Sequence, residues 1–259
     1  MIEEPYRWVE AVANRREYIE TQLAPGSPIA AVGFAEGILF VTRGRARQKL
    51  FEIYDRIAMG GIGHPGDIER LRMAAIELAS TEGFTRSAAD VSLRRLAYYS
   101  LSPVLKAAFE QVYGAPYLAR MLFAEIGDTP AADLFLRVEY DGAIAASGGA
   151  TDGAPSAFGA ISGTRASTEL MEAFLQKEHD AAGTMQRAFQ TSLNAWTVGN
   201  MALGDNGIRE LPDSAAITTA RREQGAAGRI EAVMLERDSG TAIRYRTLAR
   251  DEIDSLAAE

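Results

Sequence analysis

The sequence predicts an α+β fold, a four-layer α-β-β-α sandwich in which two antiparallel sheets stack face to face between layers of helices. The apolar patterns follow the order strands, two helices, strands, two helices, strands. Because the helices come in consecutive pairs, this order is not that of a doubly wound parallel sheet. The 259 residues can form one sizeable core, so we expect a single domain over residues 1–259.

The first element is a charged, partly amphipathic helix over residues 7–23, ended by Pro25-Gly26. Apolar runs and turn signals predict strands over 29–34, 38–42, 49–53, 56–60, 119–126, 134–140, from 143, 229–236 and 242–247. Helical spacing predicts helices over 67–80, from 87 with a kink at Pro103, over 168–178 and 184–203, and from 251. Two stretches, 145–163 and 204–228, are expected to be variable loops.

Composition excludes several classes of protein. A formal net charge of −8 without a basic block argues against nucleic acid as the main partner. The absence of cysteine excludes disulfides and thiolate metal sites. No apolar run approaches the roughly 20 residues of a membrane-spanning helix, and the acidic N-terminus lacks the apolar core of a secretory signal. We therefore expect a soluble cytoplasmic protein that uses no metal or other cofactor and does not bind a membrane.

The motif Gly61-Ile62-Gly63-His64-Pro65-Gly66 matches the dinucleotide-binding pattern G-x-G-x-x-G. A Rossmann unit needs a strand after the following helix, whereas a second helix follows here, and Pro65 removes a backbone N–H. A structural strand-to-helix turn is the better interpretation. A serine hydrolase is disfavoured too, because no G-x-S-x-G motif occurs and the two histidines, His64 and His179, lie in a turn and at a polar helix end.

Lys49 begins a strand and precedes every other lysine of the chain. Its ammonium could bind a carboxylate through a charge-assisted hydrogen bond. From chemistry alone, an exposed lysine on an edge strand is the simpler interpretation.

Several segments resemble the α-type subunits of actinobacterial-type bacterial proteasomes. The resemblance runs almost throughout and is densest between Ile29 and Gly142. The matching segments include AVGFAEGILFV, KLFEIYDRI, ERLRMAAIELA, LFAEI, VEYDGAIA, IEAVMLERD and AIRYRTL.

The resemblance implies the N-terminal nucleophile hydrolase fold without its catalytic chemistry. In the catalytic β-type relatives a processed threonine opens the first strand, and the position here is Ile29. Arg43 falls about where those relatives have an acidic residue. Ser27 lies nearby, but Pro28 and the helix before it make self-cleavage unfavourable. The chain is therefore expected to be a non-catalytic subunit of a threonine-peptidase complex.

The resemblance also implies partners and site residues. Lys49 would line a pocket between neighbouring subunits and receive the C-terminal carboxylate of a ring-shaped ATPase unfoldase. The partners would be proteasome β-type subunits and other copies of the chain in a seven-membered ring. A short gate over the axial pore would consist of Met1, Ile2, Glu3, Glu4, Pro5 and Tyr6. Pro25-Gly26 replaces a more basic stretch of the family.

Two alternatives stay open from the sequence. One is a catalytic N-terminal nucleophile hydrolase that uses Ser27 or another group. The other is a diverged homologue that assembles by itself for a non-proteolytic purpose.

Overall fold

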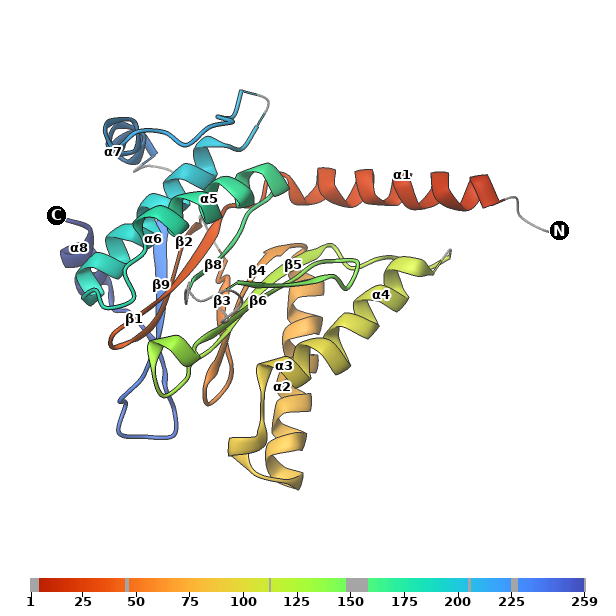
Figure 1. Ribbon diagram of the computed structural model, residues 1–259. Coiled ribbons are helices and arrows are strands. Elements are labelled where there is room, and N and C mark those ends of the chain that lie inside the picture. Colours follow the sequence, from red (N-terminus) through yellow and green to blue (C-terminus); the bar gives the residue numbers. More distant parts are fainter. Residues whose placement is uncertain are drawn as a thin grey trace.

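Two five-stranded antiparallel sheets lie face to face with helices on both outer faces (Figure 1). The computed structural model describes residues 5–44, 47–111, 113–147, 158–204, 206–224 and 228–258. The predicted fold class, the four-layer α-β-β-α sandwich of the N-terminal nucleophile hydrolases, is confirmed by this arrangement.

The strands of the first sheet follow the order β10-β9-β2-β1-β8, and those of the second follow the order β3-β4-β5-β6-β7. The first sheet contains β1 (Ile29–Phe34), β2 (Gly37–Gly44), β8 (Phe158–Ile161), β9 (Arg229–Glu236) and β10 (Tyr245–Thr247). The second contains β3 (Leu50–Tyr54), β4 (Ile57–Gly63), β5 (Ala119–Glu125), β6 (Leu134–Val138) and β7 (Ile144–Ser147). All neighbouring strands pair antiparallel, as the paired helices in the sequence predict.

Helices α5 and α6 cover the outer face of the first sheet, and α2, α3, η2 and α4 cover the outer face of the second (Figure 1). Helices α7 and α8 pack against α6. The helices are α1 (Pro5–Leu23), α2 (Pro65–Thr85), η1 (Ala88–Asp90), α3 (Leu93–Arg95), η2 (Leu96–Leu101), α4 (Ser102–Glu110), η3 (Pro130–Ala132), α5 (Arg165–Glu178), α6 (Met185–Met201), α7 (Ser214–Glu223) and α8 (Arg250–Ala257).

Strand β1 is buried on both of its faces. Alternate side chains point to opposite faces of a strand, so Ala30 and Val32 pack beneath the helices, whereas Ile29 and Ala31 pack between the two sheets. All six residues of β1 are buried. This double burial explains why the strand is a continuous apolar run instead of an alternating one.

The helical segment after Ser92 contains one π-helical turn, η2, immediately before Pro103. The N–H of Ser102 bonds to the carbonyl of Ala97, five residues earlier, so the helix is wider there than an α-helix. Proline lacks an N–H and crowds the preceding turn, which explains why the irregularity lies at this position. Pro103 was expected to kink or split the helix; the structure has this π-helical turn there, and no break separates η2 from α4.

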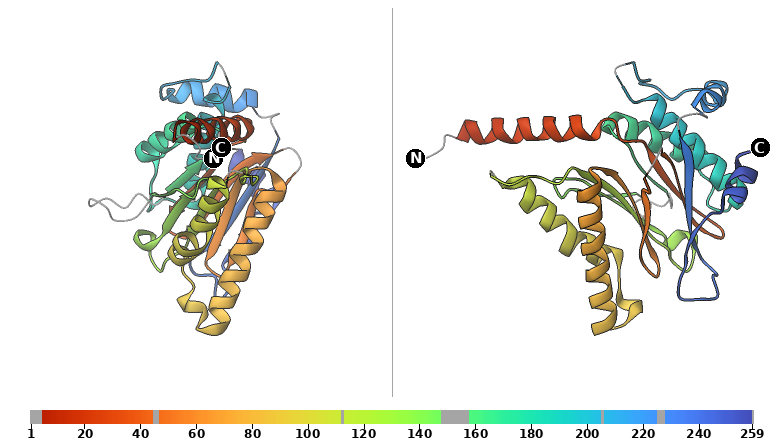
Figure 2. Two further views of the ribbon diagram at one scale, coloured as in Figure 1. Left: turned by 90° about the vertical axis from the view of Figure 1, so that its right-hand side faces the viewer. Right: turned by 180° about the vertical axis from the view of Figure 1, so that it is seen from behind.

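Helix α1 extends away from the sandwich as a rod and packs on it only through its C-terminal turns (Figures 1 and 2). Ile19 and Leu23 are buried beside Phe109 and Tyr140. Val9, by contrast, is 68% exposed. The helix starts at Pro5, two residues before the predicted start, because proline is well suited to the first position of a helix.

Two segments expected to be loops contain regular structure. Strand β8 lies within 145–163, where Gly159 lets the two sheets approach closely, since a Cβ at this position would lie 2.7 Å from Leu122 Cδ1. Helix α7 lies within 204–228. Asp213 caps α7 by accepting a hydrogen bond from the N–H of Ala216 at 2.7 Å.

A buried ion pair joins the two sheets near the C-terminal end of β1. The guanidinium of Arg237 donates to both carboxylate oxygens of Asp133, at 2.9 and 3.0 Å, and to the carbonyls of Gly127 and Phe34. Both side chains are almost fully buried. Each charge is therefore compensated by the opposite charge of its partner and by the surrounding backbone groups.

We expect Arg237→Ala to lower the free energy of unfolding by about 3–5 kcal/mol, because it leaves the carboxylate of Asp133 buried without a counter-charge. Urea unfolding of the two proteins measures the difference. Arg250→Ala is the matched control: its pair with Asp254 is exposed at both ends, so a loss of less than about 1 kcal/mol is expected. Equal losses in the two variants would contradict the prediction.

Candidate functional site

Lys49 lies immediately before β3, an edge strand of the second sheet. Its backbone N–H and that of Leu50 donate to the carboxylate of Glu231 on β9, at 3.1 and 2.9 Å. Its side-chain ammonium points back toward the start of β1 and donates to the carbonyl of Ser27 at 3.4 Å. Although it flanks an edge strand, Lys49 is thus partly buried instead of fully exposed.

The Lys49 side chain borders a cavity of about 650 Å³ at the end of the sandwich where β1 begins. Three cationic side chains, Arg43, Arg47 and Lys49, line this Lys49 pocket, against one acidic lining residue, Glu69. The other lining residues are Gln22, Leu23, Pro25, Gly26, Ser27, Gly44, Gln48, Phe51, Gly61, Ile62, Gly63, Pro65, Ile68, Trp196 and Asn200. The excess of positive charge suits the pocket to an anionic group.

Burial lowers the pKa of Lys49 to about 8, and the nearby Glu231 carboxylate opposes this shift. Burial also raises the pKa of Glu231, while its hydrogen bonds from the two backbone N–H groups act in the opposite direction. An ammonium in such surroundings gains more from a bound carboxylate than an exposed lysine does, because the site is only partly solvated.

The glycine motif forms the wall of the Lys49 pocket and the turn into α2. Gly63 has φ of 129°, and a Cβ there would lie 2.0 Å from the carbonyl of Leu118. The N–H of His64 donates to that same carbonyl at 2.7 Å, and Pro65 is the first residue of α2. The motif is therefore the predicted strand-to-helix turn, in which glycine is required by the backbone.

At the start of β1, Ile29 is fully buried between the two sheets. Its methyl groups pack so tightly on β4 that a Cβ at Gly60 would lie 3.0 Å from Ile29 Cγ2. The Ser27 hydroxyl donates to the carbonyl of Arg43 at 2.7 Å and accepts from the indole N–H of Trp196 at 3.1 Å. His179 contacts the carbonyl of Gly33, at the other end of β1. No histidine–serine pair is therefore found among the described residues.

Arg43 is a site residue that sequence reasoning did not identify as one. It was considered only as a replacement for an acidic residue, whereas the structure places it in the wall of the Lys49 pocket with its guanidinium 5.3 Å from the ring centre of Trp196. Its Nη1 donates to the carbonyl of Gln224 at 2.6 Å. The local signal was the alternation of arginines at 43, 45 and 47, which brings positive charge to one strand end.

Two of the six predicted gate residues belong to the described part of the chain. Met1, Ile2, Glu3 and Glu4 lie outside the described residues, and Pro5 and Tyr6 form the first turn of α1. The opposite end of that helix, at Gln22 and Leu23, lines the pocket.

The base of α1 is fixed by a buried arginine. Arg120 on β5 donates to Glu20 of α1, to Glu139 and to the carbonyl of Ser162, and Tyr140 donates to Glu20 at 2.8 Å. These contacts come from β5, from the turn after β6 and from the segment after β8. The direction in which α1 leaves the sandwich is therefore set by charge-assisted hydrogen bonds as well as by apolar packing.

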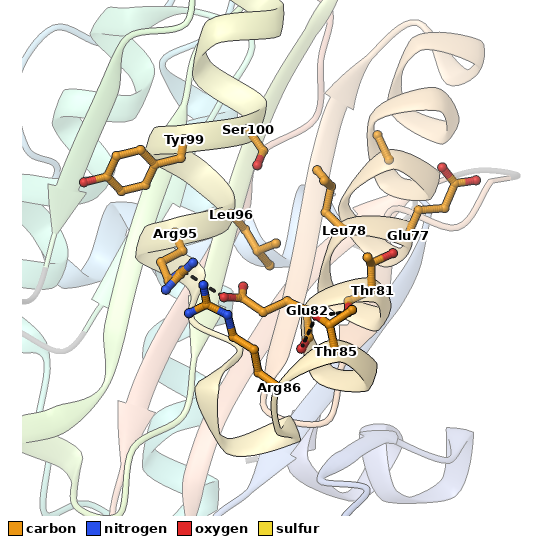
Figure 3. Close-up of a pocket in the computed structure, with 11 residues that line it drawn as sticks. Glu77, Leu78, Thr81, Glu82, Thr85, Arg86, Arg95, Leu96, Tyr99 and Ser100 are labelled. Carbon is orange, nitrogen blue, oxygen red and sulfur yellow. Dashed lines mark hydrogen bonds and ion pairs between the residues drawn. The ribbon is translucent and has the colours of Figure 1, made fainter.

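A second, larger depression of about 970 Å³ lies between α2 and η2. Figure 3 shows Leu78 and Leu96 directed into the space between these helices, whereas Tyr99 points away from α2. An ion pair of 2.8 Å between Arg95 and Glu82 crosses its lower part. Tyr99 is 81% exposed, so this face of the helical layer presents apolar area to solvent.

The described part of the chain lacks two kinds of feature. It holds no group of three or more histidine, aspartate or glutamate side chains arranged to bind a metal ion. None of its helices is both long and apolar enough to cross a membrane.

Two stacked antiparallel sheets between helical layers agree with the fold of proteasome α subunits, and the chain is similar in sequence to several of them. The chain is 28% identical to the proteasome subunit alpha of Parafrankia sp. over 252 residues, which cover 96% of the chain and 93% of that protein. It is 29% identical to that of Streptomyces coelicolor over 242 residues, 90% of the chain and 89% of the relative. A 138-residue segment, 52% of the chain and 58% of the relative, is 35% identical in Acidothermus cellulolyticus.

No protein-family model matches the chain. The relatives nevertheless confirm the predicted resemblance to actinobacterial-type proteasome α subunits, and they do so over nearly the whole chain.

We expect one of the three lysines to titrate with a pKa of about 8, well below that of an ordinary lysine, because Lys49 is partly buried. NMR of protein labelled at the lysine ε-carbon measures this titration. Lys49→Arg removes the signal and so assigns it, while the signals of Lys106 and Lys177 persist. A Lys49 signal that titrates with the ordinary value would contradict the prediction.

Proposed function

We propose that this chain is a non-catalytic α-ring subunit of a bacterial proteasome core particle in the cytoplasm. In this proposal seven copies form the ring through which substrates enter, and the ring caps a ring of threonine-peptidase β subunits. The observation that supports the proposal most is the arrangement of residues at the end of the sandwich where β1 begins. There a cationic pocket adjoins a strand whose first residue, Ile29, has a fully buried hydrocarbon side chain in place of a nucleophile.

In this proposal the Lys49 pocket receives the C-terminal carboxylate of an ATPase activator. The ammonium of Lys49 would bind the carboxylate, and Arg43 and Arg47 would add positive charge from the same wall. These arginines compensate for the basic stretch that Pro25-Gly26 replaces. Support comes from the three cations, from the partial burial of Lys49 and from the similarity to α subunits.

The gate in this proposal consists of Met1 to Tyr6, with its last two residues in the first turn of α1. The helix would carry the gate at one end while its other end borders the Lys49 pocket. The buried Arg120 and its bonds to Glu20 and Glu139 would hold the direction of the helix constant from copy to copy.

The paired helices α2 and α4 would supply apolar surface for contacts between subunits. Leu78, Phe84, Tyr99 and Val104 are exposed on this layer. Large exposed side chains grouped on one face are typical of protein–protein interfaces.

We expect a mixture of this chain with the β-type subunit encoded in the same genome to form a four-ring particle that contains both chains. Native mass spectrometry measures the stoichiometry. Two unassociated species would contradict the partnership and favour the self-assembling homologue. Peptide hydrolysis by this chain alone would favour the catalytic alternative.

We expect Lys49→Ala to leave ring assembly intact and to abolish stimulation of peptide hydrolysis by the ATPase activator, because the activator's carboxylate loses its cation. Lys177→Ala is the matched control, since Lys177 is an exposed lysine on α5 that does not line the pocket. The assay compares peptide hydrolysis by the assembled particle with and without activator. Unchanged stimulation in Lys49→Ala particles would rule out the carboxylate role while leaving the α-ring assignment intact.

A further inference from the structure

A second cationic cavity, separate from the Lys49 pocket, lies where β2, α6, α7 and α8 meet. It has a volume of about 390 Å³ and is lined by Arg43, Leu193, Thr218, Arg221, Arg222, Ala257 and Ala258. Three of its seven lining residues are arginines, and among the described residues no carboxylate side chain lines it. We call it the arginine cavity.

None of these three arginines forms an ion pair within the part of the chain that the structure describes. Arg43 is the buried one of the three, and it differs in this respect from two other buried arginines: Arg120 is paired with Glu139, and Arg237 is paired with Asp133. Buried charges in proteins are normally compensated by opposite charges. Among the described residues, the arginine cavity thus gathers positive charge without a paired carboxylate.

Arg43 separates the arginine cavity from the Lys49 pocket and is 8% exposed. Its Nε is buried and has no hydrogen-bond partner among the described residues. Burial lowers the pKa of this guanidinium. A buried guanidinium without a nearby anion is costly, so an anion that enters the cavity is attracted by the charge of Arg43.

Arg221 on α7 is held close to Arg43 and is also poorly satisfied. Its hydrogen bonds to Asn194 Oδ1 and to the carbonyl of Ala257 are long, at 3.3 and 3.4 Å. Burial lowers the pKa of Arg221, and the positive charge of Arg43 lowers it further. Two like charges therefore repel each other at the cavity wall, and an anion between them would relieve this repulsion.

We propose that the arginine cavity binds a phosphate group. Three guanidinium groups carry three positive charges and several N–H donors in rigid forks, which suits a doubly charged anion with several acceptor oxygens better than a single carboxylate. The volume admits a free phosphate or a small phosphate ester. The site is distinct from the proposed carboxylate capture at Lys49, because Lys49 does not line it, and Arg43 is the residue that the two cavities share.

The test is isothermal titration calorimetry of the full chain with inorganic phosphate, in a chloride-containing buffer at neutral pH. We expect saturable binding with one site for each chain. Arg221→Gln should weaken it by at least about tenfold, because a charge-assisted donor is lost. A second titration with glycerol 3-phosphate shows which of the two ligands the cavity prefers. Tighter binding of the ester indicates a small phosphate ester, and equal or weaker binding indicates free phosphate.

Arg209→Gln is the matched control, since Arg209 is an exposed arginine that does not line the cavity. The affinity of this variant for phosphate should equal that of the unchanged protein. Arg222→Gln removes an exposed guanidinium and gives a second readout if Arg221→Gln fails to fold. Absence of saturable binding would overturn the proposal, as would equal affinities of the cavity variants and Arg209→Gln.

Discussion

The stacking of two sheets face to face is the constraint on which the other features of this molecule depend. Strand β1 is buried on both faces from Ile29 to Phe34, so no charge can be placed along it without a large desolvation cost. Polar groups therefore gather where the strands end. At one end lie Lys49, Arg43 and the cationic pocket, and at the other lies the Arg237–Asp133 pair. The location of the candidate site follows from where the sandwich permits charge.

Strand β9 of the first sheet has a polar link to the second sheet at each of its ends. Glu231 near its start accepts from the N–H groups of Lys49 and Leu50, and Arg237 just after its end binds Asp133. The two residues are six positions apart, about 20 Å along an extended strand. The carboxylate of Glu231 holds the start of β3 in place, and it also raises the pKa of Lys49 against the effect of burial. One residue therefore affects both the backbone and the electrostatics of the pocket.

The sequence predicted the fold class, and the bounds of β1 and β9 agree residue for residue, because long apolar runs flanked by turn residues have few alternatives. Strand β8 was missed because four small and apolar residues become a strand only by pairing with β1. Arg43 could not be identified as a site residue, since its surroundings come from Trp196 and Gln224, far away in the chain. Local patterns predict elements well, but they do not predict which distant elements surround one side chain.

The position of β9 in the first sheet also determines when the chain can complete its fold. It lies between β10 and β2 although almost the whole sequence precedes it, and its link to Lys49 spans 182 residues. During synthesis β2 is made early, and its edge stays unpaired until β9 has left the ribosome. An unpaired, buried-type strand edge is a ready template for wrong pairing. Nascent chains that stop before residue 229 therefore carry an aggregation hazard that the finished protein has lost.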